Sequence, residues 1–551
     1  MNVLALSRWS RLVLAIYLFI LMVVSYNIQH VCAKRNEVSI IEWKGLVLIK
    51  ESLNIPQDSI LSIKDNAQVV FYSSSNVTQP ITININGSLE IGKHVQFMSL
   101  DVFQGTKPVP SFNNEMWSFV LDGQTRRLDL DSVSVIKSQR LKAVQTFDIQ
   151  QSLDSIKLSN CTMNGGYNLF RIISGEHVFH VTESKFENMQ TVLLIALPEN
   201  ACRVTVSNCY FSKIGNTFVH KGSDNKNAKN SFTVENTVFD NVGQGINSER
   251  VSLKLTNVDF KWFKSGIVSY NITAFRVKFD NFNMKESGIA IANNQPDVSN
   301  GVFDIQQCTF QNIHGLAVFM NYNMKLFRFT NNKVINLTPS SGLPSIPLNL
   351  IGGPLFNFDS VVFEQNEIVN CQVNGFYSIV NFDNIGALSF VRNTLTGNSG
   401  KCSLTIKNAI NNNLRIEKNI FDSVETVNGD VCVQKANSKL NVSLNYWGKK
   451  VDKSLKLTTS EMNEIISTKL SPSKYFEFVP YYLTSNVNDN DASNLGGYIT
   501  PEPSKNSDNL GIIIGASIGG AALLLVIVGV IILTLVFYNR KKRAYTEISS
   551  I

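Results

Sequence analysis

The sequence lacks the cysteine and histidine pattern of a structural metal site. Its eight cysteines and six histidines include no C-x-x-C pair and no mixed cluster, and zinc sites need such closely grouped ligands. We therefore predict no metal and no cofactor. Cys32 falls within the predicted signal peptide, so seven cysteines remain. An odd number implies at least one unpaired thiol or an intermolecular bond.

A basic patch is also missing. The formal net charge is +7, but Arg8 and Arg11 account for +2 and the C-terminal tail for +3, so only +2 remains for the long segment between them. A nucleic-acid-binding domain needs Lys and Arg clustered on one face. We therefore expect no nucleic-acid partner.

The N-terminal residues have the pattern of a secretory signal peptide. An apolar run from Leu12 to Val24 follows the two arginines, and small residues lead to a cleavage site at about Ala33. We predict a signal peptide over residues 1–33. The alternative is an uncleaved N-terminal anchor, because the stretch before the cleavage site is long.

A second apolar run, Ile512 to Tyr538, contains no charged residue and is long enough to cross the roughly 30 Å hydrocarbon core of a bilayer. Basic residues from Arg540 to Arg543 follow it, and such residues stay on the cytoplasmic side. We predict a type I single-pass membrane protein with a transmembrane helix at residues 510–538 and a cytoplasmic tail at 539–551. The predicted location is the plasma membrane or an endolysosomal membrane, with the N-terminus extracellular or lumenal.

Two short motifs lie at the membrane-proximal end. Gly511, Gly515 and Gly519 have the spacing that lets two membrane helices approach closely, which makes a homodimer through them a hypothesis. Tyr545 and Ile548 form a Y-x-x-Φ sequence, the pattern of an endocytic sorting signal.

The middle of the chain is a degenerate repeat marked by a bulky apolar anchor. Thirteen anchors cover 312 residues at a mean spacing of 26. Apolar residues at offsets of two precede many anchors, which is typical of strands. A short strand that recurs at this spacing indicates a solenoid, in which each coil buries its apolar face against its neighbours. The anchors are Val135, Met163, Phe186, Phe211, Phe239, Phe260, Phe279, Phe310, Val334, Ile368, Leu395, Phe421 and Trp447.

Asparagine recurs at two fixed places beside the anchors. Stacked amides two residues before the anchor can hydrogen-bond along the stack at about 4.8 Å spacing, and asparagine two residues after the anchor tolerates the left-handed conformation of a sharp bend. The first column is Asn332, Asn366, Asn393, Asn419 and Asn445. The second is Asn188, Asn241, Asn281, Asn312, Asn336 and Asn370.

With these columns the sequence resembles the right-handed parallel β-helix, or pectin-lyase-like, superfamily over about residues 55–483. The best local match is Asn445-Tyr446-Trp447-Gly448, followed later by Phe478-Val479-Pro480-Tyr481. Many carbohydrate-associated members of the superfamily close with a similar sequence. The resemblance implies an all-β, right-handed parallel β-helix solenoid, and it does not imply any one activity.

The solenoid is expected to fill residues 34–483, with opening rungs from Ile60 to Leu100 and caps at both ends. Thr458 and Glu461 form a capping box that predicts a short helix to about Leu470. Residues 484–509 are predicted to form a polar juxtamembrane linker. Cys402 and Cys432 follow glycines at similar places in adjacent coils, so we predict a disulfide between them.

Six N-x-S/T sequons agree with export and predict a glycoprotein. They are Asn76, Asn86, Asn160, Asn271, Asn336 and Asn441.

Catalytic residues of the related sugar enzymes are largely missing. Of the polygalacturonase-like motifs only an isolated R-x-K, Arg276 to Lys278, is present, and no Asp cluster resembles the calcium site of pectate lyases. Asp240 and Asp280 are the remaining candidate acids, two rungs and about 10 Å apart on the outward face, with Lys261 between them. An exposed ladder of ion pairs explains the same residues.

Three functions are compatible with the sequence. The first is a cell-surface recognition or adhesion module that binds glycans or another surface ligand, and this is the one that we predict. The second is a membrane-tethered polysaccharide lyase or hydrolase, which needs several acids and an Arg in one outward groove. The third is a structural component of a surface coat. An outward aromatic row would favour glycan binding.

Overall fold

The computed structural model describes residues 38–497 with short gaps. The gaps are 73–79, 100–101, 104–116, 138–144, 174–175, 197–201, 221–229, 249–250, 270, 282–287, 294–300, 321–322, 340–347, 351–357, 375–376, 410–412, 424, 437 and 488–493. The predicted signal peptide, transmembrane helix and tail lie outside the described residues, as do the Asn76 sequon, the glycine motif and the Y-x-x-Φ motif. No helix formed by the described residues has the length and hydrophobicity of a membrane span.

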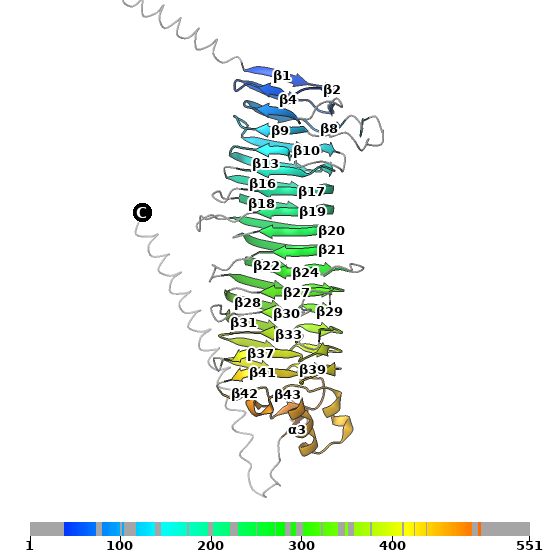
Figure 1. The fold of residues 1–551 in the computed structure, drawn as a ribbon, viewed down its shortest axis with the longest axis vertical. Helices are drawn as coiled ribbons and strands as arrows, with labels where there is room; N and C mark the ends of the chain where they lie inside the picture. Colours follow the sequence, from blue (N-terminus) through cyan, green and yellow to red (C-terminus); the bar gives the residue numbers. More distant parts are fainter. Residues whose placement is uncertain are drawn as a thin grey trace, which may run out of the picture. The chain divides into compact units, whose positions relative to one another are not determined.

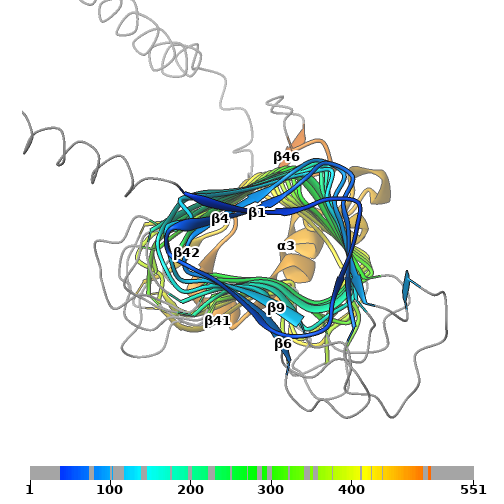
Figure 2. The same cartoon turned by 90° about the horizontal axis from the view of Figure 1, so that it is seen from above.

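The described chain is an all-β solenoid of parallel strands (Figure 1). The strands of one coil pair in parallel with strands of the next, so that β13 (Leu153–Ser159) pairs with β16 (His177–Thr182), which pairs with β18 (Cys202–Ser207). Viewed from above, the coils superimpose around one interior (Figure 2). The all-β class and the parallel solenoid are therefore confirmed.

Each coil contributes to three stacks of strands. The first stack runs from β1 (Ser39–Trp43) to β38 (Leu414–Glu417). The third runs from β3 (Leu53–Ile55) through β41 (Val431–Ala436) to β43 (Leu470–Ser471). The solenoid therefore begins at Ser39, one coil before the opening rungs that the sequence predicts.

The second stack carries the anchors. Four of its strands are long enough to continue around a bend into another stack. Its strands are β2 (Leu46–Ile49), β5 (Gln68–Phe71), β8 (Gln96–Ser99), β11 (Ser134–Ile136), β14 (Thr162–Asn164), β17 (Lys185–Ile195), β19 (Tyr210–His220), β20 (Ser231–Ser248), β21 (Ser252–Val268), β23 (Lys278–Asp280), β26 (Thr309–Gln311), β29 (Lys333–Ile335), β32 (Glu367–Val369), β35 (Thr394–Thr396) and β39 (Ile420–Asp422).

The phenylalanine anchors form a continuous stack inside the solenoid. Phe186, Phe211, Phe239, Phe260, Phe279 and Phe310 are direct register partners on successive strands. Neighbouring rings are parallel to within 13° with centroids 4.6–5.0 Å apart. Each ring therefore fills the core of its own coil and contacts the coils above and below, which links coil stacking directly to apolar burial.

The first asparagine column is a buried hydrogen-bonded ladder. The side-chain amide of each residue from Asn332 to Asn419 donates to the Oδ1 of the next asparagine, at 2.9–3.2 Å. The same Oδ1 also accepts the backbone N–H of the preceding member. A backbone carbonyl takes the remaining amide proton, as in the 2.9 Å bond from Asn393 to Phe363. The side-chain amides of the column are therefore fully hydrogen-bonded as well as buried.

The second asparagine column has one exception. Five of its six members have positive φ values of 54–56°, as a left-handed bend requires. Asn281 is instead fully buried, and its Oδ1 accepts the N–H of Phe263 at 2.9 Å. The register explains the difference, because Ser265 pairs with Ile289 and this coil has five more residues between its anchor and the third stack. The prediction of a bend residue was wrong at this position.

The C-terminal end is capped as predicted. Thr458 and Glu461 form a reciprocal capping box at the start of α3 (Thr459–Thr468), and the helix buries Ile466. Trp447 stacks on Phe421 with centroids 5.2 Å apart. Further along, β45 (Tyr481–Tyr482) pairs antiparallel with β46 (Leu495–Gly496). The folded part therefore extends to Gly497, beyond the start predicted for the linker.

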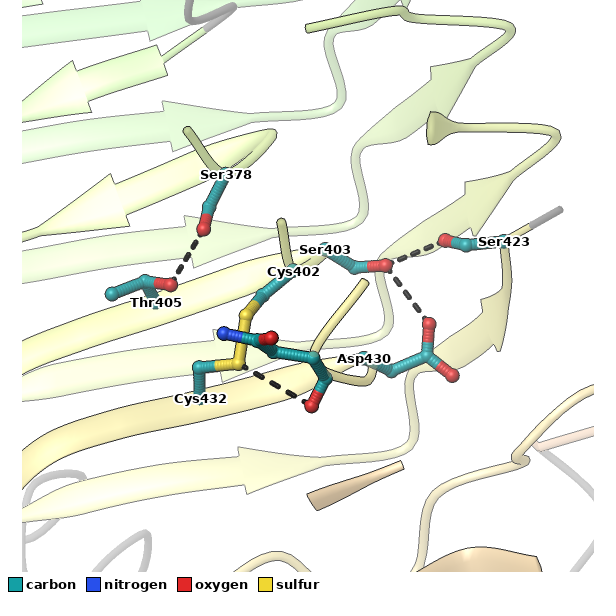
Figure 3. Close-up of a disulfide and its surroundings, with 8 residues drawn as sticks. Ser378, Cys402, Ser403, Thr405, Ser423, Asp430 and Cys432 are labelled. Carbon is teal, nitrogen blue, oxygen red and sulfur yellow. Dashed lines mark hydrogen bonds between the residues drawn. A yellow bond between two sulfur atoms is a disulfide. The ribbon is translucent and has the colours of Figure 1, made fainter. Parts of the chain in front are cut away.

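A disulfide joins Cys402 and Cys432, the pair that the sequence predicts, with their Cα atoms 6.2 Å apart (Figure 3). The five other cysteines of the described chain are unpaired and buried, namely Cys161, Cys202, Cys209, Cys308 and Cys371. Burial raises the pKa of these thiols, to about 11 for Cys161 and Cys209 and to about 12 for the other three.

We expect thiol labelling to separate these two classes. The thiolate is the reactive form, so iodoacetamide at neutral pH should leave the five buried cysteines unlabelled in the folded protein. Denaturation should expose all five, and only subsequent reduction should release Cys402 and Cys432. Peptide mapping by mass spectrometry checks both steps. Labelling of Cys402 without reductant would contradict the disulfide.

Candidate functional site: an open groove on the outward bend

Asp240 and Asp280 lie where the sequence places them, in one outward column. Asp240 is the register partner of Lys261, and Lys261 is the partner of Asp280. The two acids are thus two rungs apart, about 10 Å by strand spacing. The column brings the candidate acids and the lysine together on one face.

Both carboxylates are already engaged by neighbouring side chains. The hydroxyl of Tyr210 donates to Asp240 at 2.6 Å. Asp280 accepts from Gln311 at 2.5 Å and from Asn312 at 3.0 Å, and Lys278 lies 3.2 Å away. Burial raises the pKa of Asp280, but these three partners outweigh it and hold the pKa below its usual value. Asp280 is therefore an ionised member of a surface ladder, unlike a general acid, which needs a raised pKa.

The isolated R-x-K motif belongs to the same surface. Lys278 is the partner of Asp280, and the guanidinium of Arg276 lies over the ring of Phe275 while its Nε donates to Gln307 at 3.2 Å. Within the described residues no three His, Cys, Asp or Glu side chains are grouped so that they could hold a metal ion. The chemistry of this face is therefore that of hydrogen-bonded and ion-paired side chains.

An open groove of about 440 Å³ lies beside this column, at the bend that follows the anchors. Its lining comes from three successive coils and is mainly polar: Gly166, Tyr167, Asn188, Met189, Gln190, Lys213 and Gly215. Each coil contributes residues of the bend between its second-stack and third-stack strands, so the groove crosses the coils. We refer to these seven residues as the bend groove.

Glycines contribute to the floor of the bend groove. A Cβ on Gly215 would lie 2.7 Å from the Gln190 side chain. Gly166 has a φ of 100° and packs on the stem of Lys137, whose ammonium is buried and donates to the carbonyl of Trp117 at 2.8 Å. The floor is thus backbone and aliphatic stem, on which a flat ligand can lie.

The walls supply the polar chemistry of the groove. Asn188 and Lys213 both have left-handed backbones, which turn their side chains outward at the bend. Asn188 donates to Asn164 at 2.9 Å, whereas Lys213 is exposed and forms no ion pair with any described residue. Tyr167 adds a half-buried aromatic ring. An aromatic face, amides and an unpaired cation together suit a polar, hydroxyl-rich ligand.

The sequence reasoning missed the bend groove entirely. Asp240 and Asp280 lie on the neighbouring face and are not part of its lining. One signal was available, because Lys213 stands in the second asparagine column and takes the left-handed conformation there. The lining also includes Gly215, and no pattern in a single sequence marks that glycine as a floor residue.

The five described sequons differ in exposure. Asn160, Asn336 and Asn441 are exposed, and Asn86 and Asn271 are half-buried. Asn336 has a left-handed backbone, and its amide points toward the Oδ1 of Asn312 at 3.5 Å.

We expect efficient glycosylation at Asn160, Asn271 and Asn441 and low occupancy at Asn336. Asn271 and Asn441 lie beside inward residues and point away from the core, and Asn160 lies at a bend, where its amide donates to Ser132 at 3.3 Å. Asn336 belongs to the turn column, where its amide donates to Asn312 at 3.5 Å. Glycopeptide mass spectrometry measures the occupancy of each site. Full occupancy at Asn336 would contradict this ranking.

Comparisons with known proteins leave the family open. No family model matches the chain, and neither the curated proteins nor the solved structures include a match.

Proposed function

We propose that the protein is a single-pass type I glycoprotein of the cell surface or endolysosomal membrane, whose solenoid is a recognition or adhesion module that binds glycans. We also propose that the solenoid is right-handed and related to the pectin-lyase-like superfamily. The predicted signal peptide, the apolar run with its basic flank and the sequons support this membrane location. The observation that supports the binding role is the bend groove, whose lining includes Tyr167, two glycines and Lys213, which forms no ion pair with a described residue.

The positions of the two candidate acids support a protein that binds glycans without cleaving them. Catalysis on a polysaccharide needs an acid and a base positioned around a space for substrate. Asp240 and Asp280 lie outside the bend groove and are engaged by Tyr210, Gln311 and Asn312. Both carboxylates are therefore hydrogen-bonded to neighbouring side chains on the surface of the solenoid.

A glycan array tests the proposal with the full chain in detergent. We expect selective binding, which Tyr167→Ala weakens about tenfold because it removes an aromatic contact. Lys213→Met should weaken binding of acidic glycans most. The matched controls are Tyr377→Ala and Lys254→Met, which remove an exposed Tyr and Lys on other surfaces. No selective binding, or equal losses in both sets of variants, would overturn the proposal.

A further inference from the structure

The first coil, residues 38–55, is the uncovered end of the solenoid. Its strands β1, β2 and β3 each pair with the following coil, and no described strand pairs with their other edge. The backbone N–H and C=O groups along that edge are therefore open to a further strand. The C-terminal end differs, because α3 and β43 follow the last coil there.

The apolar interior of the solenoid reaches this end without a cover from any described residue. Ile41, Val47 and Leu53, one from each strand of the first coil, point inward but are only partly buried. Their register partners on the next coil are fully buried, namely Leu61, Val69 and Ile83. One further coil on this end would bury the first three side chains in the same way.

The outer rim of the first coil is also apolar. Ten large apolar side chains of the described chain are exposed, and four of them belong to this one coil: Val38, Ile40, Leu46 and Leu48. Ile40 and Leu46 are the most open of the four, at 63% and 61%. Outward side chains of an edge strand pack against those of a neighbouring strand, and clustered exposed apolar residues mark interaction sites. Interior and rim thus both favour a protein partner at this end.

A second copy of the same coil fits this end. A partner has to extend three strand edges around one interior, and another first coil has the same outline. A twofold axis through the middle of β1, perpendicular to the solenoid axis, places β1 antiparallel to its counterpart and β2 beside β3 of the other copy. The apolar interior of each copy then continues into that of the other.

Neither the preceding residues nor charge opposes this pairing. Cleavage of the predicted signal peptide leaves only residues 34–37 before the first coil, and these four are polar and too few to cover three strands. The first coil has no net charge, because it carries two acids and two lysines, namely Glu42, Glu51, Lys44 and Lys50. Two identical coils can therefore approach without net repulsion.

We propose that the first coil is a homophilic contact, through which the solenoid joins end to end with that of a second copy. This contact goes beyond the proposed glycan-binding function and does not depend on it. The first coil and the C-terminal cap lie at opposite ends of the solenoid (Figure 1), so the two caps of a joined pair face away from each other. With the proposed membrane anchor after the cap, such a pair bridges two membranes.

The contact should be weak for a single pair. The first coil supplies 18 residues, fewer than the about 20–30 residues a side of a standard stable interface. Many copies on two facing membranes add their contacts, so a weak pair becomes effective there. We therefore expect self-association that rises with concentration in solution, and clustering between membranes.

Sedimentation velocity of the full chain in detergent tests the contact itself. Ile40→Lys/Leu46→Lys charges both rim positions and should weaken self-association at least about tenfold. Ile40→Ser/Leu46→Ser, without added charge, should act in the same direction. Both rim variants should keep the wild-type melting temperature, because the two side chains point outward. The matched control is Val427→Lys/Leu455→Lys, which changes two exposed apolar residues toward the C-terminal end and should associate like the wild type.

Vesicle clustering tests the bridging of membranes. Two dye-labelled populations of phosphatidylcholine vesicles carry the full chain, and energy transfer between the dyes reports clustering. We expect wild-type vesicles to cluster with each other and not with protein-free vesicles, and the rim variants to cluster at least about tenfold less. Equal clustering with protein-free vesicles would overturn the proposal, because the partner would then be a lipid surface.

The remaining outcomes separate this contact from the proposed function. No association of the wild type, or equal association of wild type and rim variants, overturns the homophilic contact and leaves glycan binding on the array unaffected. Intact mass then shows whether residues 1–33 are retained as the cover. Association lost in Tyr167→Ala but kept in the rim variants also overturns the contact, because the bend groove would then bind the partner's N-linked glycans. A chain that does not float with vesicles overturns the membrane anchor, and sedimentation still decides the contact.

Discussion

Asn393→Leu should lower the free energy of unfolding by about 4 kcal/mol, since each buried polar group left without a partner costs about 1–3 kcal/mol. Asn393 is fully buried in the middle of the asparagine ladder. Its Oδ1 accepts from both the backbone and the side chain of Asn366, and its amide donates to Asn419 and to the carbonyl of Phe363. Leucine has a similar volume but leaves Asn366 and Phe363 with buried, unpaired groups.

Thr396→Leu is the control for this exchange. Thr396 is on the same coil, three residues along, and its side chain points out of the solenoid. The change should stay within about 0.5 kcal/mol. Chemical denaturation followed by circular dichroism compares the two variants. If both unfold at the same denaturant concentration as the wild type, the asparagine column does not hold the coils together.

Asp430→Ala should destabilise the C-terminal cap by about 3–5 kcal/mol, the cost of removing one partner from a buried ion pair. Asp430 is fully buried beside the disulfide (Figure 3), where its Oδ2 accepts from the Lys469 ammonium at 2.6 Å and its Oδ1 from Ser403 at 3.0 Å. Lys469 is the C-cap of α3, and its carbonyl accepts the backbone N–H of Asp430. The pair thus ties the cap helix to the last coil.

Two controls distinguish the loss of the buried Asp430–Lys469 pair from a general effect of removing charge: a variant of an exposed ion pair and a double variant. Glu367→Ala breaks an exposed pair, Lys333 with Glu367 at 3.0 Å, and should cost less than about 1 kcal/mol. Adding Lys469→Met to Asp430→Ala should recover part of the loss, because it removes the buried unpaired ammonium. Hydrogen exchange of the α3 amides reports the cap directly. Unchanged protection of α3 in Asp430→Ala would contradict this role.

The sequence predicted those features that repeat from coil to coil. The phenylalanine stack and the asparagine ladder follow from a fixed spacing to the anchor, because parallel strands in register place equal positions on top of each other. The capping box could be predicted from Thr458 and Glu461 alone, since it depends only on local contacts. These features need no knowledge of what lies elsewhere in the molecule.

Features set by irregularities could not be predicted. Asn281 has the right residue type at the right spacing, but an insertion of five residues in its coil moves it into the core. The segment after Thr484 is polar, yet the side chain of Asn494 bonds Thr484 at 2.7 Å and brings β46 back onto β45. The bend groove combines Tyr167, Gln190 and Lys213 from three coils, and only the three-dimensional register shows that they meet.

The measurement that tests the central claim most directly is the fate of a bound glycan. The full chain is incubated with a glycan selected on the array, the complex is isolated, and the ligand is released and analysed by mass spectrometry. A solenoid that binds without catalysis should return the glycan intact, and Tyr167→Ala should retain much less of it. Recovery of shortened or unsaturated chains, abolished by Asp240→Asn or Asp280→Asn, would contradict the account and identify the protein as an enzyme.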